Sequence, residues 1–253
     1  MSVGADWSDL AAHERPGWIT GKGVLATVAA AGVLLAAGYL LAVAWRTGYL
    51  FPLERVELAH APERLTGEEV REALAPHLHR NMLRLDVRGA RRALESLPWV
   101  DEVTVQRVWP ETLSVTIRER QAVARWGGDS LLDEAGEVFS PPPATFPGGL
   151  PQLRGAAGQA GEVLAFHRRL ERLFHDTGVN VTSLTLTPRG AWQARFDDGV
   201  ELAIGREQPV QRVERFVDVL PALEGGGWAR IERVDLRYPN GFAVAWSEAA
   251  AAD

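Results

Sequence analysis

The chain of 253 residues contains no cysteine. This absence excludes a disulfide framework and any metal site built from thiolates. It also fits an oxidising compartment, in which free thiols are a liability. Basic clusters are missing as well. The net charge is −6, and no block of lysine or arginine stands out. We therefore expect no nucleic-acid partner.

Motifs for catalysis are equally scarce. After the apolar run described below, the chain has no H-E-x-x-H, G-x-S-x-G or S-x-x-K motif. His77 and His79 lie close together without a pattern of carboxylates around them, which favours surface histidines over a metal site. Asp197 and Asp198 precede Gly199 between two expected strands and are interpreted as turn residues. We predict no catalytic residue, no metal, no cofactor and no enzymatic activity.

One long hydrophobic run is present, from Val24 to Trp45. It carries no charge over 22 residues. At about 1.5 Å per residue it is about 33 Å long, enough to cross a hydrocarbon core of about 30 Å. A buried core helix and a cleaved signal peptide are the alternatives. A core helix without a polar face is rare at this length, and a signal peptide has a shorter apolar core nearer the terminus, so a membrane span is favoured.

The charges beside the span do not set its orientation clearly, because Arg15 and Lys22 precede it and Arg46 and Arg55 follow it. A long C-terminal part translocates largely regardless of its charge. We therefore predict a cytoplasmic tail (1–23), a single span (24–45) and about 200 residues outside the cytoplasm.

Residues 50–120 are expected to form a small α+β unit in the order strand, helix, helix, strand, strand. The strand is expected within 51–60, with an apolar side made of Phe51, Leu53, Val56 and Leu58. Thr66 and Glu69 have the spacing of a capping box at the start of the first helix, which Pro76 limits. Asp86 is the expected N-cap of the second helix, which ends before Pro98.

The unit closes with a hairpin over 100–120, turning at Trp109-Pro110-Glu111. In its second strand Leu113, Val115 and Ile117 alternate with polar residues, which is typical of a half-buried strand. Pro110 falls between the two strands, where its missing N–H removes no ladder hydrogen bond.

Residues 121–247 are expected to form a second unit rich in short strands, and 248–253 a flexible tail. Two helices are predicted, over 162–174 and 209–223. Each of these helices has an apolar stripe along one face. The residues of these stripes are Val163, Phe166, Leu170 and Leu173, then Val210, Val213, Val217 and Leu220. Strands are expected over 122–126, 131–139 with a break, 150–154, 181–187, 191–196, 200–204, 231–238 and 242–246.

The last strand, Phe242 to Trp246, carries neither a charge nor a proline. At the edge of a sheet it would be the kind of strand that soluble proteins usually protect, and hence a candidate for strand addition by a partner. Tyr238, Phe242, Val244 and Trp246 would then serve as anchors. The alternative is a central strand whose aromatic residues belong to the core, and the sequence favours neither.

Several short motifs follow one another along the chain after the span. They are Phe51-Pro-Leu53, Leu97-Pro-Trp99-Val100, Trp109-Pro110-Glu111, Ala124-Arg125-Trp126, Asp133-Glu-Ala-Gly136 and Val234-Asp-Leu-Arg-Tyr238. In this order the chain resembles the FtsQ/DivIB family of cell-division proteins. The resemblance implies an α+β fold with a single N-terminal transmembrane helix, a POTRA domain (βααββ, 50–120) and a mixed "β domain" (121–247) that ends in an edge strand.

The family resemblance also implies a function. The protein would be a single-pass type II protein of the inner membrane, with its bulk in the periplasm at the division septum. It would bind FtsB, and through it FtsL, by strand addition to its last strand, and so help to control septal peptidoglycan synthesis. Other divisome proteins would bind the POTRA domain. The alternatives are a docking or chaperone-like protein of envelope assembly and an envelope enzyme with an unrecognised site.

The partner-binding residues of the family map onto the last strand and its approach. They are Arg237, Tyr238, Gly241, Ala243 and Trp246, to which the anchors Phe242 and Val244 are added. The family has a small residue where this chain has Phe242, which affects the side-chain contacts but not the main-chain pairing. A basic residue before Trp192 also contributes in the family, and Arg189 is its nearest match here.

Overall fold

The structure is a computed structural model that describes residues 21–47, 51–223 and 227–247. The predicted tails, 248–253 and most of 1–23, lie outside these ranges. So do Gly225 and Gly226, which with Gly227 are expected to form a loop after the predicted helix 209–223. The first element is helix α1 (Gly21–Thr47). Its apolar stretch, Val24–Arg46, is long enough to span a membrane, and none of it is buried against the rest of the protein. The alternative of a buried core helix is therefore wrong.

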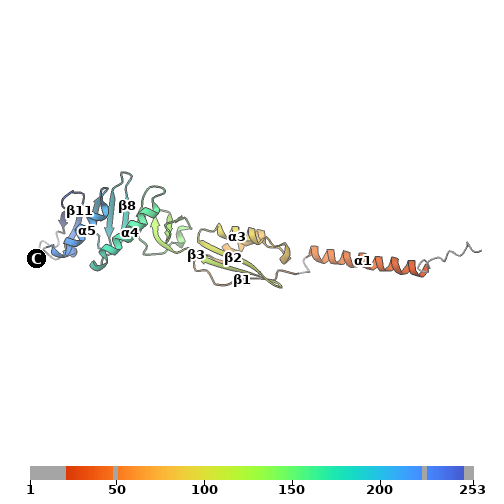
Figure 1. Cartoon of the computed structure of the whole chain (residues 1–253). Helices are drawn as coiled ribbons and strands as arrows, with labels where there is room; N and C mark the ends of the chain where they lie inside the picture. The colour runs from red at the N-terminus through yellow and green to blue at the C-terminus, as the bar shows by residue number, and fades with distance from the viewer. Residues whose placement is uncertain (1–20, 48–50, 224–226, 248–253) are drawn as a thin grey trace, which may run out of the picture.

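The first module has the predicted order of one strand, two helices and two strands (Figure 1). In its three-stranded sheet, β3 lies between β1, with which it is parallel, and β2, with which it is antiparallel. The elements are β1 (Arg55–Leu58), α2 (Gly67–Leu74), α3 (Val87–Glu95), β2 (Val100–Val108) and β3 (Thr112–Glu119).

The two helices of this module begin where the sequence predicts. The Thr66 hydroxyl accepts a hydrogen bond from the Glu69 N–H at 3.2 Å, and the Glu69 carboxylate accepts one from the Thr66 N–H at 2.7 Å, which completes the capping box. Asp86 accepts from the Gly89 N–H at 2.9 Å and caps α3. Val70, Leu74 and Leu94 are buried against the inner face of the sheet.

The prediction for the first strand is wrong in two respects. Only Arg55–Leu58 joins the sheet, and all four of these residues are exposed. Of the expected apolar side, only Leu53 packs against the core. The reason is that β1 is an edge strand paired with β3 alone, whereas α3 packs on β2, at the other edge of the sheet. Ahead of it, Phe51 adopts a φ of 60° and Pro52 pairs with Asn81, which takes this segment out of the ladder.

The second module is one nine-stranded sheet with α4 (Ala160–Phe174) and α5 (Pro209–Val219) packed on it (Figure 1). Its strands lie in the order β12-β11-β10-β9-β8-β7-β4-β5-β6. Their bounds are β4 (Ala122–Trp126), β5 (Ser130–Asp133), β6 (Val138–Phe139), β7 (Gln152–Arg154), β8 (Val181–Leu186), β9 (Trp192–Phe196), β10 (Glu201–Gly205), β11 (Ile231–Asp235) and β12 (Ala243–Trp246). The predicted α+β fold class is confirmed.

The helices of the second module differ from the prediction in detail. Helix α5 ends at Val219 and continues only as a 3-10 turn (Leu220–Ala222), because Pro221 has no N–H with which to extend the helix. Val213 and Leu220 are buried as expected, whereas Val210 and Val217 are half-buried. In α4, three residues of the expected stripe are buried and Leu173 is half-buried.

Aromatic side chains fill much of this core, including one that the sequence reasoning missed. Phe216 of α5 is fully buried. Phe174 and Phe196 stack edge-to-face on each other with centroids 4.7 Å apart, and Trp228 packs on both. Such pairs add to the stabilisation from burial alone.

Buried contacts join the two modules. Trp99, at the start of the hairpin, is 2% exposed, and its indole N–H donates to the Thr145 hydroxyl at 2.9 Å. The Trp99 ring also lies edge-on to Phe139, with centroids 5.3 Å apart. Arg120 pairs with Asp133 at 3.0 Å. Leu131 of β5 and Phe139 of β6 belong to the same buried cluster as the core residues of the first module.

The Arg120–Asp133 pair gives a first prediction. The Asp133 carboxylate also accepts the backbone N–H groups of Ala135 and Glu137, so Asp133→Ala leaves three donors at a poorly exposed site without their acceptor. We expect it to lower the free energy of unfolding by about 1–3 kcal/mol. Urea denaturation followed by tryptophan fluorescence measures the change. Asp129→Ala, which removes an exposed carboxylate four residues away, is the control, and equal effects of the two changes would contradict the prediction.

Candidate functional site

Strand β12 forms one end of the nine-stranded sheet and pairs only with β11. The pairing is antiparallel, with Val234 opposite Val244 and Asp235 opposite Ala243. The interpretation of this segment as an edge strand is therefore confirmed, and the alternative of a central strand is wrong. Within the described part of the chain, no strand covers its outer side.

The backbone of β12 presents its hydrogen-bonding groups to that open side. Ser247 donates its N–H to the Arg230 carbonyl at 2.9 Å, toward β11. Successive N–H groups of a strand point to alternate sides. The N–H groups of Val244 and Trp246 therefore point away from β11, where another strand can pair with them.

The side chains of this segment divide into inward and outward groups. Phe242 and Val244 pack half-buried on the core, and the Phe242 ring lies edge-on to Phe216 with centroids 5.2 Å apart. By contrast, Tyr238 is 55% exposed and Trp246 is 43% exposed. Tyr238 and Trp246 are thus exposed to solvent at the two ends of the edge, whereas Phe242 and Val244, between them, hold the strand on the core.

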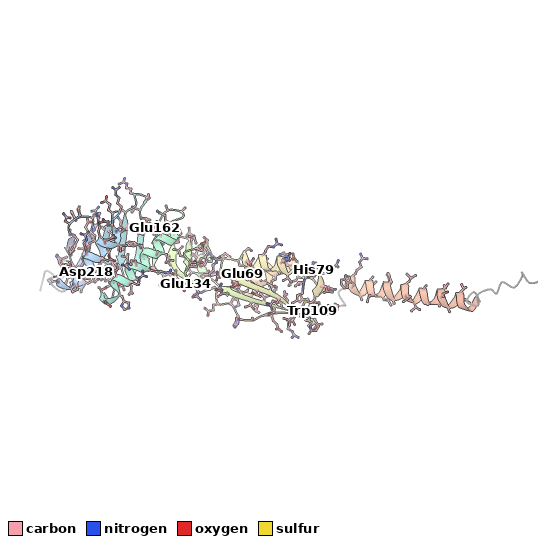
Figure 2. All side chains as sticks on the ribbon, viewed as in Figure 1. Glu69, His79, Trp109, Glu134, Glu162 and Asp218 are labelled. Carbon is pink, nitrogen blue, oxygen red and sulfur yellow. The ribbon has the colours of Figure 1, made fainter. Side chains whose placement is uncertain are left out.

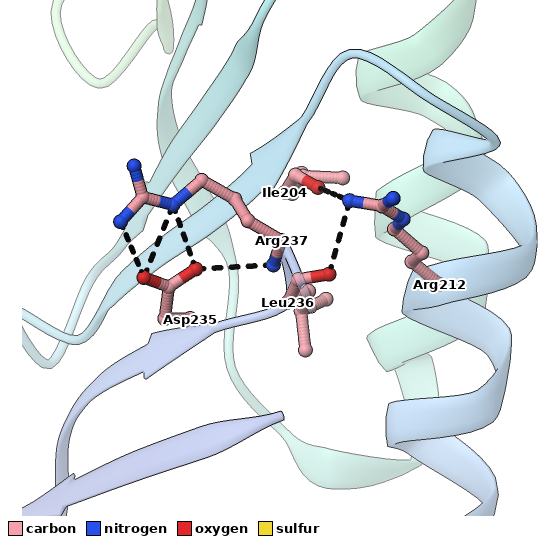
Figure 3. Close-up of polar contacts among 5 residues, drawn as sticks. All are labelled: Ile204, Arg212, Asp235, Leu236 and Arg237. Carbon is pink, nitrogen blue, oxygen red and sulfur yellow. Dashed lines mark hydrogen bonds and ion pairs between the residues drawn. The ribbon is translucent and has the colours of Figure 1, made fainter. Parts of the chain in front are cut away.

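Arg237 and Asp235 form the polar end of the edge (Figure 3). The Arg237 Nε donates to Asp235 Oδ1 at 2.8 Å, its Nη2 donates to Oδ2 at 2.6 Å, and its backbone N–H donates to Oδ1 at 3.0 Å. The hydrogen bond from the guanidinium is the main reason why the pKa of Asp235 is lowered, and burial opposes it. The same bond raises the pKa of Arg237. This turn ends β11 at Asp235, so the prediction that the strand extends to Tyr238 is wrong.

A second arginine fixes helix α5 to the strands beneath it (Figure 3). Arg212 is 9% exposed, and its Nη1 donates to the Leu236 carbonyl at 3.2 Å and to the Ile204 carbonyl at 3.4 Å. Gly205 lies between the two arginines with a φ of 86°. A Cβ there would lie 3.0 Å from the Arg212 guanidinium and 3.2 Å from the Arg237 Cγ, so only glycine suits both the conformation and the space.

A cleft of about 310 Å³ separates α5 from the turn that leads into β12. Arg215, Asp218 and Val219 line its helix side, and Gly241 and Phe242 line the other. Arg215 donates to the Pro239 carbonyl at 3.2 Å and so joins the helix to this turn. The sequence reasoning missed these α5 residues. The signal in the sequence is Val219, an apolar residue outside the predicted apolar stripe. In the structure its side chain is 42% exposed.

Arg189 is the one predicted site residue that the structure does not bring to the strand. It lies exposed in the turn between β8 and β9. In the sheet, β10 and β11 lie between β9 and β12. Trp192, at the start of β9, pairs with Gly205, which packs against Arg237. Arg189 and Arg237 therefore share one end of the sheet without contact between them, and the role of Arg189 stays a prediction.

Titratable groups elsewhere have structural roles. Asp197 accepts hydrogen bonds from Asn180, and Asp198 accepts from the Val200 N–H and the Trp228 indole, which confirms them as turn residues. His77 lies 3.7 Å from the Asp86 carboxylate, beside the cap of α3. Within the described residues, no group of three histidines and carboxylates is placed to hold a metal ion. The arrangement at β12 is suited to binding an extended peptide.

Comparison with known proteins gives concordant matches. The family model "Cell division protein FtsQ/DivIB, C-terminal" matches residues 124–237, and "POTRA domain, FtsQ-type" matches residues 51–120. The cell division protein FtsQ of Shewanella oneidensis is 34% identical over 248 residues, which cover 96% of this chain and 94% of that protein. Those of Thioalkalivibrio sp. (34% over 236 residues; 92% and 97%) and Coxiella burnetii (34% over 195 residues; 77% and 80%) are similar.

The polar end of the edge gives a prediction about pH. We expect Arg237→Gln to raise the pKa of Asp235 towards its ordinary value of about 3.9, since the guanidinium is the largest cause of its lowering. A lowered carboxyl pKa contributes stability above the unfolded pKa, and this contribution is lost as the pH falls through the folded pKa. A ¹³C NMR titration of labelled aspartate carboxyl carbons measures the shift. The control is Arg195→Gln, which breaks an exposed pair with Glu201. An unchanged Asp235 pKa in Arg237→Gln would rule out the guanidinium as its cause.

Proposed function

The chain belongs to the FtsQ/DivIB family of cell division proteins, and from this premise we propose that it is a membrane-anchored scaffold that binds its partner along β12. The premise is carried by the two family models and by a relative that is 34% identical over 96% of the chain. The family is a cell division family and not a known enzyme family. The observation that carries the proposed binding mode is the open, uncharged edge of β12.

The proposed location follows from α1 and the length of chain behind it. Helix α1 is apolar and unburied, as in a protein with a single span. Residues 1–23 are then cytoplasmic, and both modules lie in the periplasm at the division septum. Those modules contain all the residues proposed here for partner binding.

The proposed partner is FtsB, with FtsL bound through it. An extended segment of FtsB adds to β12 as a tenth strand and pairs with the outward N–H groups of Val244 and Trp246. Tyr238 and Trp246 contact it from the two ends of the edge, as exposed aromatic residues do in many interfaces. The complex then helps to control septal peptidoglycan synthesis.

The smaller residues of the site have a role in this arrangement. Gly241 and Ala243 carry little or no side chain and allow a second backbone to come close. The cleft beside α5 can receive side chains of the partner that flank the added strand. Arg237 is oriented by Asp235, and Arg189 stands at the same end of the sheet, so both are proposed to meet acidic groups of the partner. Other divisome proteins are proposed to bind the first module.

The binding proposal is tested with a matched pair of substitutions at the two edges of one sheet. Trp246→Glu places a charge on β12, and we expect co-purification of the full-length chain with FtsB to fall at least tenfold. Val138→Glu places the same charge on β6, at the opposite edge, at a position of similar exposure (46% against 43%), and should leave co-purification unchanged. Circular dichroism verifies that both variants fold.

Tyr238→Glu is the second variant of this test, at the other end of the edge. Undiminished FtsB binding by both Trp246→Glu and Tyr238→Glu would refute the site. Membership of the family would stand, because it rests on the sequence of the whole chain.

The proposed topology has its own test. An alkaline phosphatase fused after Asp253, which needs an oxidising compartment, should be active, whereas green fluorescent protein fused there should not fluoresce after export through the general secretory route. The same two reporters fused before Met1 are the control and should give the reverse. Fluorescence of the C-terminal fusion would place the modules in the cytoplasm and refute the topology.

A further inference from the structure

Exposed apolar residues gather at the end of the first module where the chain enters it. The Phe51 and Trp109 rings pack edge-to-face, with centroids 5.3 Å apart and planes at 84°. Both rings remain about half exposed, as do their neighbours Leu83 and Val108. Figure 2 shows Trp109 at the end of the module nearest to α1. We refer to these four residues, together with Arg80 and Arg84, as the entry tip.

The entry tip is a built feature, because hydrogen bonds join its three chain segments. The Met82 N–H donates to the Phe51 carbonyl and the Leu53 N–H donates to the Arg80 carbonyl, each at 2.8 Å. The Arg107 guanidinium donates to the Leu85 carbonyl at 2.7 Å and ties the hairpin turn to the same place. Phe51 is held at a φ of 60°, which is costly for a bulky side chain, and yet it is not buried.

Within the three chain segments that form the tip the charges are mainly positive, although the whole chain has a net charge of −6. Its three segments, 51–55, 80–85 and 107–111, carry four arginines against two glutamates, Glu54 and Glu111. Arg55 pairs with Glu57 and Arg107 is bound to a carbonyl. The side chains of Arg80 and Arg84 are exposed and have neither an ion pair nor a hydrogen bond within the described residues.

The tip lies close to the membrane because of where it stands in the chain. Helix α1 has 27 residues and ends at Thr47. It is therefore about 40 Å long, which matches a bilayer of about 40–45 Å including its headgroups. Phe51 follows four residues later, and four residues span at most about 14 Å. No other exposed aromatic pair in the described part of the chain is tethered so closely to the span.

We propose that the entry tip docks on the outer surface of the bilayer that α1 crosses. Phe51 and Trp109 lie in the interfacial layer, which aromatic side chains favour, with Leu83 and Val108 beside them. Arg80 and Arg84 bind the phosphates of anionic lipid headgroups. The first module is then held in one orientation on the membrane. This inference rests on the span but not on partner binding at β12, so the two can fail separately.

The lack of cysteine makes a direct test possible, since one introduced cysteine is a unique labelling site. Val108→Cys places an environment-sensitive fluorophore (nitrobenzoxadiazole) at the tip. Val138→Cys, a valine of nearly equal exposure in β6, is the matched control (48% and 46%). The full-length protein is reconstituted into vesicles that contain lipids with a spin label near the headgroup, and quenching of the fluorophore reports contact with the bilayer.

We expect the label at 108 to be quenched at least twofold more than the label at 138, and more strongly with 30% anionic phosphatidylglycerol than with phosphatidylcholine alone. The double substitution Arg80→Gln and Arg84→Gln, at two exposed side chains, should remove the effect of anionic lipid. Equal quenching at 108 and 138 would overturn the proposal and leave the tip as a surface for a protein. Equal quenching in the two lipid compositions would overturn the role of the arginines.

Discussion

Each backbone N–H and C=O group needs a hydrogen-bond partner, and this requirement shapes both ends of the chain. In a lipid environment no water can supply the partner, so the segment that crosses the membrane is a helix, α1, which pairs its own groups. In water a sheet can stop with one side unpaired, and the nine-stranded sheet does so at β12. The first solution encloses the backbone, and the second leaves it available to another chain.

What lies between these ends controls where the open edge stands. The contacts of Trp99 with Thr145 and of Arg120 with Asp133 join the two modules. Farther along, Arg212 ties α5 to the carbonyls of Ile204 and Leu236, just before the chain turns into β12. Burial makes these polar contacts effective, because a donor or acceptor left alone there is costly. If the entry tip rests on the bilayer, this series of contacts carries a fixed orientation from the membrane to β12.

The sequence predicted the local structure of the chain better than the long-range arrangement of its elements. The caps at Thr66 and Asp86 and the alternation in β3 depend on neighbouring residues, and they were predicted correctly. The burial of β1 was predicted wrongly, because alternation identifies a strand's apolar side but not whether a helix covers it. The cleft residues of α5 were missed because they, too, depend on a long-range contact. Their proximity to Gly241 depends on the packing of a helix against a turn that lies over twenty residues away in sequence.

The open edge must also be selective, since main-chain pairing accepts almost any extended peptide. Two features limit the choice. Strand β12 has only four residues, so few hydrogen bonds are available and side-chain contacts must supply much of the affinity. Tyr238 and Trp246 stand at opposite ends of the edge, and the cleft of α5 lies beside its start, so a partner must match their spacing as well as pair. Arg237 is already bound to Asp235, and its charge therefore adds less to this selection than its exposure implies.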